Sequence, residues 1–197
     1  MKHIFGSRNR VPGFSTTTSA AAKNVIGWAK DIANALEFMH SKGIIHRDLK
    51  LENTLLSHDD VVKVADVGLS KEEDMITCTQ MGTPHYMAPE VASFRHYDRK
   101  ADIYSFGVML WEMWYGKRAF EGIHADELHE RVVLGIRPEH VQDRTEPPNE
   151  WQGLMQRCWD GRPDCRPHST ACHEELTRLY EEANKPVLAH QSAHPLN

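Results

Sequence analysis

The most informative stretch of this chain is His46-Arg47-Asp48-Leu49-Lys50-Leu51-Glu52-Asn53, and the triplet Asp66-Val67-Gly68 begins thirteen positions after its last residue. Between the two motifs, Thr54–Leu56 is a short apolar run and residues 61–65 form a second run rich in β-branched side chains. Residues 57–60 consist of Ser, His and Asp, which favour a turn. Two such runs separated by a turn predict a β-hairpin.

The predicted hairpin gathers polar side chains at its open end. Because the two ends of a hairpin meet, we expect Asn53 to lie beside Asp66, at about the 5 Å spacing of neighbouring strands. An amide oxygen and a carboxylate at that spacing can share one hydrated magnesium ion, which prefers oxygen ligands. Asp48 lies five residues before Asn53, within reach of whatever the metal holds. The pattern predicts metal-assisted phosphoryl transfer.

The same residues carry a family resemblance. The catalytic loop of protein kinases reads H-R-D-L-x-x-x-N, and a D-x-G triplet and an A-P-E follow it in that order. Here the A-P-E closes the segment Gly82–Glu90, and further matches are Asp102 near the start of an apolar helix, Cys158-Trp159 and Arg166-Pro167. The ordered set spans residues 46–167. The chain therefore resembles the large helical C-lobe of a protein kinase, most like the tyrosine-kinase-like branch of the serine/threonine kinases.

The resemblance is confined to one lobe. Protein kinases also carry a Gly-rich loop over the phosphates and a strand lysine that pairs with a helix glutamate. The glycines before His46 do not form G-x-G-x-x-G, and Ala20–Lys23, which superficially matches the lysine strand motif, leads directly into a predicted helix. Only 45 residues precede His46, too few for that lobe. We expect the N-lobe to be absent from this chain, and the isolated chain to be a weakly active or inactive fragment of a longer kinase.

The resemblance implies which residues are catalytic. Asp48 matches the aspartate that orients the substrate hydroxyl and accepts its proton; capping of a turn is its alternative role. Lys50 matches the lysine that neutralises the transferring phosphoryl group, and Thr83 matches the threonine that contacts the catalytic aspartate, both as in serine/threonine kinases. Asn53 and Asp66 match the magnesium ligands, with turn chemistry as the alternative. The implied cofactors are ATP and Mg²⁺, at a site comprising Lys50, Asn53, Leu55 and Asp66.

Regulation is implied for the segment that follows the Asp66 triplet. Residues 70–81 are polar without a regular period and predict a mobile activation segment. Arg47 matches the arginine that binds a phosphorylated activation loop, with Thr77 and Thr79 as candidate phosphorylation sites or, alternatively, solvated loop threonines. Val67 replaces the phenylalanine usual in the family, a departure that concerns conformational switching more than magnesium binding.

Four residues are implied to be structural supports. Glu90 and Arg166 match a glutamate and an arginine that form a buried ion pair in kinases. Asp102 matches the residue that accepts hydrogen bonds from the catalytic-loop backbone, and we group His46 with it. Residues 101–114 are apolar on nearly all sides, which predicts a buried helix, and an enclosed carboxylate in its first turn needs donors.

Composition indicates no competing chemistry. The 23 basic and 28 acidic residues give no electrostatic reason to expect nucleic-acid binding. Three cysteines recur every seven residues, but no C-x-x-C pair accompanies them, so we favour structural cysteines over a zinc site at Cys158, Cys165 and Cys172. The longest apolar stretch, residues 106–115, is too short to span a membrane. Residues 1–30 contain basic but no acidic side chains, a weak likeness to a mitochondrial presequence; we favour a linker and a cytoplasmic location.

Hydrophobic periodicity predicts the domain boundaries. Residues 1–22 are expected to be irregular, residues 23–184 to form the kinase C-lobe, and residues 185–197 to form a flexible tail. Helices are expected at residues 24–42, 101–114, 125–134, 150–159 and 170–182, with Gly43 as a C-terminal stop and Asn149 as an N-cap. The missing lobe should leave apolar surface exposed around His46, Leu55 and Val67.

Three functions fit this sequence to different degrees. The favoured one is a protein serine/threonine kinase domain that transfers the ATP γ-phosphate to protein hydroxyls. The alternative is a non-catalytic, kinase-like module that docks proteins through its helical surface. A small-molecule phosphotransferase fits less well, because Gly82–Glu90 is typical of peptide substrates.

Overall fold

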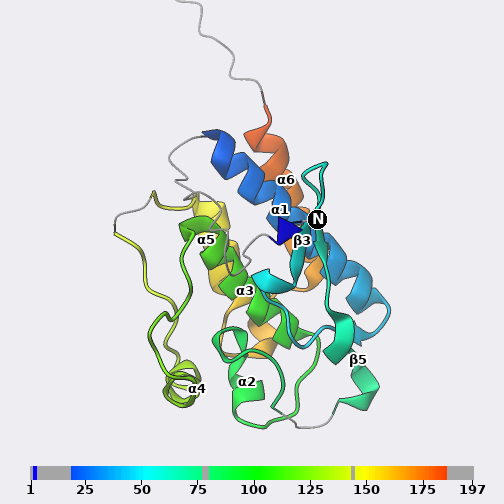
Figure 1. Ribbon diagram of the computed structural model, residues 1–197, viewed down its shortest axis with the longest axis vertical. Coiled ribbons are helices and arrows are strands. Elements are labelled where there is room, and N and C mark those ends of the chain that lie inside the picture. The colour runs from blue at the N-terminus through cyan, green and yellow to red at the C-terminus, as the bar shows by residue number, and fades with distance from the viewer. Residues whose placement is uncertain (1, 4–18, 77–79, 143–144, 186–197) are drawn as a thin grey trace, which may run out of the picture.

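The computed structural model describes residues 2–3, 19–76, 80–142 and 145–185 (Figure 1). Its helices are α1 (Ser19–Ser41), α2 (Pro89–Ala92), α3 (Lys100–Tyr115), α4 (Ala125–Val133), α5 (Asn149–Cys158) and α6 (Ser169–Ala183). Its strands are β1 (Lys2–His3), β2 (Ile44–Ile45), β3 (Thr54–Leu56), β4 (Val62–Val64) and β5 (Lys71–Glu72). Short 3₁₀ turns join them: η1 (Leu51–Asn53), η2 (Val67–Leu69), η3 (Glu73–Met75), η4 (Pro84–Tyr86) and η5 (Pro163–Cys165).

Helix α3 forms the centre of the core, as its apolar sequence predicts. All of its residues except Ser105 are buried, and helices α1 and α5 pack against it (Figure 1). Gly107 permits the close approach of α5, because a Cβ at this position would lie 2.9 Å from the Cβ of Cys158. A helix buried on all sides fixes the position of whatever lies at its ends, and Asp102 lies in its first turn.

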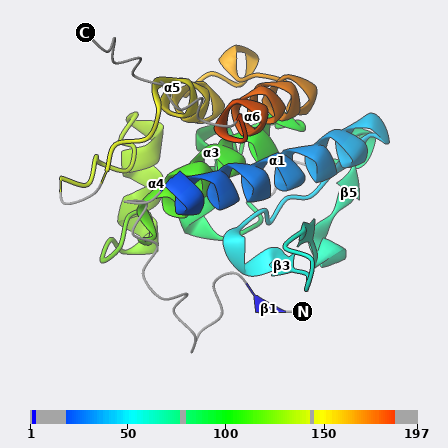
Figure 2. The ribbon, with the colours of Figure 1, turned by 90° about the horizontal axis from the view of Figure 1, so that it is seen from above.

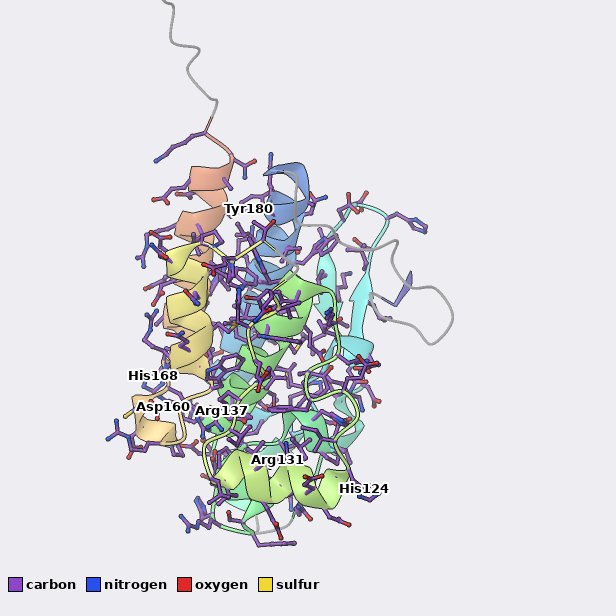
Figure 3. All side chains as sticks on the ribbon, turned by 90° about the vertical axis from the view of Figure 1, so that its left-hand side faces the viewer. His124, Arg131, Arg137, Asp160, His168 and Tyr180 are labelled. Carbon is purple, nitrogen blue, oxygen red and sulfur yellow. The ribbon has the colours of Figure 1, made fainter. Side chains whose placement is uncertain are left out.

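Helices α1 and α6 lie side by side (Figure 2), and α1 packs against α3. Tyr180 of α6 lies against α1, where a Cβ on Gly27 would come within 3.0 Å of the Tyr180 ring (Figure 3). The Lys30 ammonium lies 4.7 Å from the centroid of the same ring. The apolar stripe of α1 is thereby covered. The end of α1 is followed by β2 and then by the predicted catalytic loop.

The predicted hairpin is present. Strand β3 pairs with β4 in antiparallel register, Thr54 opposite Val64, and β1 adds to the outer edge of β3 with His3 opposite Leu55. A second two-stranded sheet joins β2 to β5, with Ile45 opposite Lys71. This second sheet was not predicted, because strands of two residues are too short to show a period.

Several predicted boundaries differ from the structure. Helix α1 begins at Ser19 rather than at residue 24, since the alanines at its start favour helix. The N-cap expected at Asn149 is wrong: Asn149 is the first residue of α5, and the carbonyl of Pro148 accepts from the backbone N–H of Gln152. Gly43 ends the first helix with a φ of +69°, as predicted.

The expected irregular and mobile segments are only partly described. Residues 71–75, which were predicted to be mobile, form β5 and η3. The candidate phosphorylation sites Thr77 and Thr79 lie outside the described residues, as do most of the expected N-terminal segment and of the expected tail. Within the described part of the chain, no helix has the length and apolar character needed to cross a membrane.

Candidate active site

Asp48 lies on the loop between β2 and η1, where the side chains of three other residues converge on it. Thr83 Oγ1 donates to Asp48 Oδ1 at 2.7 Å, and Lys50 Nζ lies 2.7 Å from Asp48 Oδ2. Lys50 Nζ also donates to Thr83 Oγ1 at 2.8 Å, which closes a ring of three interacting groups. Asn53 Nδ2 donates to Asp48 Oδ2 at 3.2 Å. The structure therefore brings together all four residues that were predicted to be catalytic.

The neighbours of Asp48 control its ionisation. Partial burial on its own would raise the pKa of this carboxyl, but hydrogen bonds from Lys50 and Thr83, the Lys50 charge and the Asn53 amide together lower the pKa below its ordinary value. Asp48 is consequently an ionised hydrogen-bond acceptor at neutral pH. A carboxylate held in this way is suited to orienting a hydroxyl group.

Thr83 reaches Asp48 because the residue before it is glycine. Gly82 has a φ of +107°, and a Cβ at this position would lie 2.5 Å from the carbonyl oxygen of Arg47. Any other residue would be strained and would push the Thr83 segment away from the loop. Gly82 therefore allows the two segments to make contact.

The orientation of the Asn53 amide suits a cation ligand. Asn53 Nδ2 lies 2.8 Å from the carbonyl oxygen of Asp48 and 3.2 Å from its carboxylate, so this end must be the donating NH₂ group. The side-chain oxygen is then the remaining polar atom of a residue that is only 7% exposed. An amide oxygen fixed in this way can serve as a ligand to a hard divalent cation.

Asp66, the second predicted ligand, lies at the same end of the hairpin as Asn53. The backbone N–H of Ala65 donates to the carbonyl of Asn53 at 2.8 Å, so the two predicted ligands are adjacent along the hairpin. Asp66 is exposed and adopts a left-handed backbone conformation with a φ of +59°. One amide and one carboxylate oxygen fit a magnesium ion that keeps several of its waters.

The loop that carries Asp48 is supported from below by Asp102. This carboxylate, 1% exposed, accepts from the backbone N–H groups of His46 at 2.8 Å and Arg47 at 3.0 Å. His46 in turn lies with Nε2 3.1 Å from the carbonyl oxygen of Ala65, which connects the loop to the Asp66 turn. The donors that the enclosed carboxylate required are thus the backbone of the catalytic loop.

His40 is a support that the sequence analysis missed. Its Nε2 lies 2.9 Å from Asp102 Oδ2, and its Nδ1 lies 3.1 Å from Ser169 Oγ at the start of α6. A buried histidine on α1 therefore joins three helices beneath the loop. The sequence did not indicate this role, because a histidine in the last turn of an amphipathic helix is commonly exposed.

Glu90 and Arg166 form the buried ion pair that the resemblance implies. Arg166 donates through both terminal nitrogens to the two carboxylate oxygens, at 2.6 and 2.8 Å, and its side chain has no exposed surface. The guanidinium also lies 5.2 Å from the centroid of the Tyr104 ring. This pair holds α2, which contains Glu90, against the end of η5, which Arg166 directly follows.

Arg47 lies at the edge of the candidate site. It has a φ of +71°, and its Nε donates to the hydroxyl of Tyr97 at 2.9 Å. Together with Met81, Met87 and Tyr97 it lines a small open pocket next to the end of the predicted activation segment. Nothing in the described residues tests its predicted contact with a phosphorylated threonine.

Two further predictions can be compared with the structure. The apolar surface expected near the site is present at Val67, which is 60% exposed, but not at His46, which is fully buried; Leu55 is partly buried beside β1. Cys158 and Cys172 are buried with their sulfurs 3.8 Å apart, whereas Cys165 is exposed. In the part of the chain that the structure describes, no group of three or more His, Cys, Asp or Glu side chains could hold a metal ion.

A buried acid next to the Thr83 segment was also missed. Glu112 accepts from the Tyr86 hydroxyl at 2.5 Å and from the backbone N–H of Ala119 at 2.8 Å. Burial raises the pKa of Glu112 to about 7. The Tyr86 hydroxyl also lies 3.4 Å from Glu52, which forms an ion pair with Arg118.

An ionised aspartate, a lysine, and amide and carboxylate oxygens are the groups that metal-assisted phosphoryl transfer would use. Comparisons with known proteins agree. The sequence profile described as protein tyrosine and serine/threonine kinase matches residues 8–176. The chain therefore belongs to the protein kinase family, and its mainly helical structure with small antiparallel sheets is a kinase-like C-lobe.

Curated relatives support this membership. A probable LIM domain-containing serine/threonine-protein kinase of Dictyostelium discoideum is 37% identical over 155 residues, which are 78% of this chain and 16% of that protein. Dual serine/threonine and tyrosine protein kinases of Canis lupus familiaris and Danio rerio are 40% and 39% identical over 144 residues, which are 71% of this chain and 15% and 16% of those proteins. The chain thus spans only about a sixth of the length of these relatives.

Proposed function

We propose that this chain is the catalytic lobe of a protein kinase that transfers the γ-phosphate of ATP to serine or threonine hydroxyls of proteins. The observation that carries the proposal is the ring formed by Asp48, Lys50 and Thr83. A lysine at the aspartate and a threonine hydroxyl donating to it are the two features that favour serine/threonine over tyrosine specificity. Because some relatives are dual serine/threonine and tyrosine kinases, the proposed serine/threonine specificity should be tested against tyrosine.

Each side chain of the ring has a defined role in this proposal. Asp48 accepts a hydrogen bond from the substrate hydroxyl and aligns its oxygen with the γ-phosphorus of ATP. It takes the hydroxyl proton as the oxygen–phosphorus bond forms and the bond from the γ-phosphorus to the ADP oxygen breaks, with ADP as the leaving group. Lys50 neutralises charge on the transferring group. Thr83 holds the carboxylate in the orientation that faces the substrate.

Asn53 and Asp66 complete the site as ligands for Mg²⁺, which would bring positive charge to the phosphates of ATP. Asn53 is fixed by its donation to Asp48, so a displacement of one residue disturbs the other. Leu55, on the first strand of the hairpin, is proposed to contact the nucleotide.

The Gly-rich loop and lysine that cover ATP in kinases are not among these 197 residues, and we propose that phosphate transfer is weak when the chain is assayed alone. A cytoplasmic location remains a prediction from the sequence.

A direct test compares phosphate transfer from ATP to serine, threonine and tyrosine versions of one peptide. The protein would be assayed as the 197-residue chain and as a chain extended by a kinase N-lobe. We expect transfer to the serine and threonine peptides by the extended protein, and its loss in Asp48→Asn and Asp66→Asn. If both variants bind a partner protein as well as the wild type does, and no form of the protein transfers phosphate, the result would instead favour the docking module.

A further inference from the structure

An ion pair outside the catalytic ring holds the segment that follows Asp66. The Arg99 guanidinium contacts Glu73 Oε2, and its Nε donates to Glu73 Oε1 at 3.1 Å. The backbone N–H of Arg99 donates to the same Oε1 at 3.1 Å. Hydrogen bonds from Arg99 lower the pKa of Glu73, so the carboxylate is charged at neutral pH. Paired, bidentate contacts of this kind are stronger and more directional than single ones.

The pair connects elements that surround the catalytic loop. Arg99 immediately precedes α3, and its NH1 donates to the carbonyl of His40 at the end of α1 at 3.1 Å. The backbone N–H of Glu73 donates to the carbonyl of Gly43 at 2.8 Å. Strand β5 before Glu73 pairs with β2, which leads directly into His46. Glu73 is therefore connected to the end of α1, to Gly43 and to β2, the elements that precede the predicted catalytic loop.

The other end of the same segment is tied to the same loop. Ala65 donates to the carbonyl of Asn53 at 2.8 Å, and its own carbonyl lies 3.1 Å from Nε2 of His46. Residues 65–73 are thus held at both ends by the chain from 43 to 53. Asp66 lies between the two attachments, exposed, with a positive φ.

We propose that Glu73 and Arg99 are positioning residues for Asp66, an inference that rests on the proposed kinase function. The pair closes the downstream end of the segment and keeps the Asp66 carboxylate at the spacing from Asn53 that a shared cation needs. Glu73 and Arg99 do not touch the substrate or the nucleotide. They act by restricting the turn that carries the metal ligand.

The test uses charge reversal in the full chain. The variants are Glu73→Arg, Arg99→Glu and the two together, and the matched control is reversal of the ion pair Arg157–Glu175, which joins α5 to α6 away from the site. Hydrogen exchange of the backbone amides of residues 65–73 is measured for each. Glu73→Gln, which removes the charge but keeps the shape, replaces Glu73→Arg if the reversal unfolds the protein.

Each single reversal should accelerate exchange in residues 65–73 by about tenfold or more, as expected when charge-assisted hydrogen bonds that close a segment are lost. The double reversal should bring the rates back toward wild type, and the control pair should leave them unchanged. Unchanged rates in both single variants, or an equal acceleration from the control pair, would overturn the proposal.

A second readout links the pair to the metal. In the phosphate-transfer assay of the extended protein, Glu73→Arg should raise the Mg²⁺ concentration for half-maximal rate by about tenfold and leave the peptide KM unchanged, since the loss of one such interaction corresponds to about that factor. An unaltered Mg²⁺ requirement would overturn the positioning role. Hydrogen exchange is measured without any catalysis. A protein with no transfer activity would therefore refute the proposed function, while the exchange rates would still test whether the Glu73–Arg99 ion pair restricts residues 65–73.

Discussion

Replacement of Glu112 by glutamine should remove a large part of the pH dependence of stability. Glu112 is 2% exposed and lies between the Tyr86 hydroxyl and the backbone N–H of Ala119. Glutamine has nearly the same shape and can satisfy both neighbours. Its oxygen would accept from Ala119, its NH₂ would donate to the Tyr86 oxygen, and the Tyr86 proton would turn to Glu52, 3.4 Å away.

The size of the effect follows from the raised pKa. Burial raises the pKa of Glu112 from 4.5 to about 7 in the folded chain. Between these values the unfolded chain loses the proton and the folded chain keeps it. The stability contributed by this group is therefore fully present well below pH 4.5, falls as the pH rises from 4.5 to 7, and is lost above 7. Linkage gives a loss of roughly 2.5 kcal/mol between about pH 5 and pH 8 from this group alone.

Urea unfolding of wild type and Glu112→Gln at about pH 5, 6, 7 and 8 measures this loss. The difference in free energy of unfolding between the two proteins should change by roughly 2.5 kcal/mol in favour of the variant across that range. The exposed residue Glu121, in the turn after Ala119, provides the control Glu121→Gln, which should follow the wild-type curve. Parallel curves for wild type and Glu112→Gln would refute the reasoning, because they would mean that the buried carboxyl is ionised as readily in the folded as in the unfolded chain.

Three further experiments test other parts of the structure. Glu90→Ala leaves the buried Arg166 without its partner and should cost about 3–5 kcal/mol in thermal unfolding, whereas Lys50→Ala should cost less than about 1 kcal/mol; equal losses would contradict the assignment of support and catalytic roles. Gly82→Ala should destabilise by at least about 1 kcal/mol more than Gly122→Ala, because both positions have positive φ but only at Gly82 would a Cβ meet a neighbouring atom. Asp48→Asn should slow phosphate transfer by about 100- to 10,000-fold at an unchanged melting temperature, and a normal rate would exclude Asp48 as the base.

Local patterns were sufficient to predict much of the fold. The apolar sequence of α3 predicted a buried helix, and the alternation of strand-forming and turn-forming residues after Asn53 predicted the hairpin. Both signals lie within short windows of sequence. The contact between Thr83 and Asp48 joins residues 35 positions apart, and it could be expected only through the family resemblance.

The remaining features depend on tertiary contacts that carry no local signal. In the sequence, Glu112 cannot be distinguished from any other single polar residue within an apolar helix. Its partners Tyr86 and Ala119 come into contact with it only when α3 packs into the core. Glu73 and Arg99 are ordinary charged residues in their own segments, and their pairing follows from the fold of the chain between them. His40 likewise acquires its partners only where three helices meet.

Asp48, which contacts Thr83, and Glu112, which contacts Tyr86, show how the same fold can shift the pKa of two acids in opposite directions. Asp48 is partly buried, but cationic and hydroxyl donors surround it and lower its pKa. Glu112 is enclosed more completely, receives hydrogen bonds from a phenol and one amide, and has a raised pKa. A carboxylate with a lowered pKa is a weak base, which suits phosphoryl transfer, because most of its barrier is overcome by positioning and charge stabilisation before the proton must move. Under the proposed function, the donors around Asp48 therefore favour alignment of the hydroxyl over strength as a base, and a variant that removed Lys50 would raise the basicity of Asp48 and still lose rate.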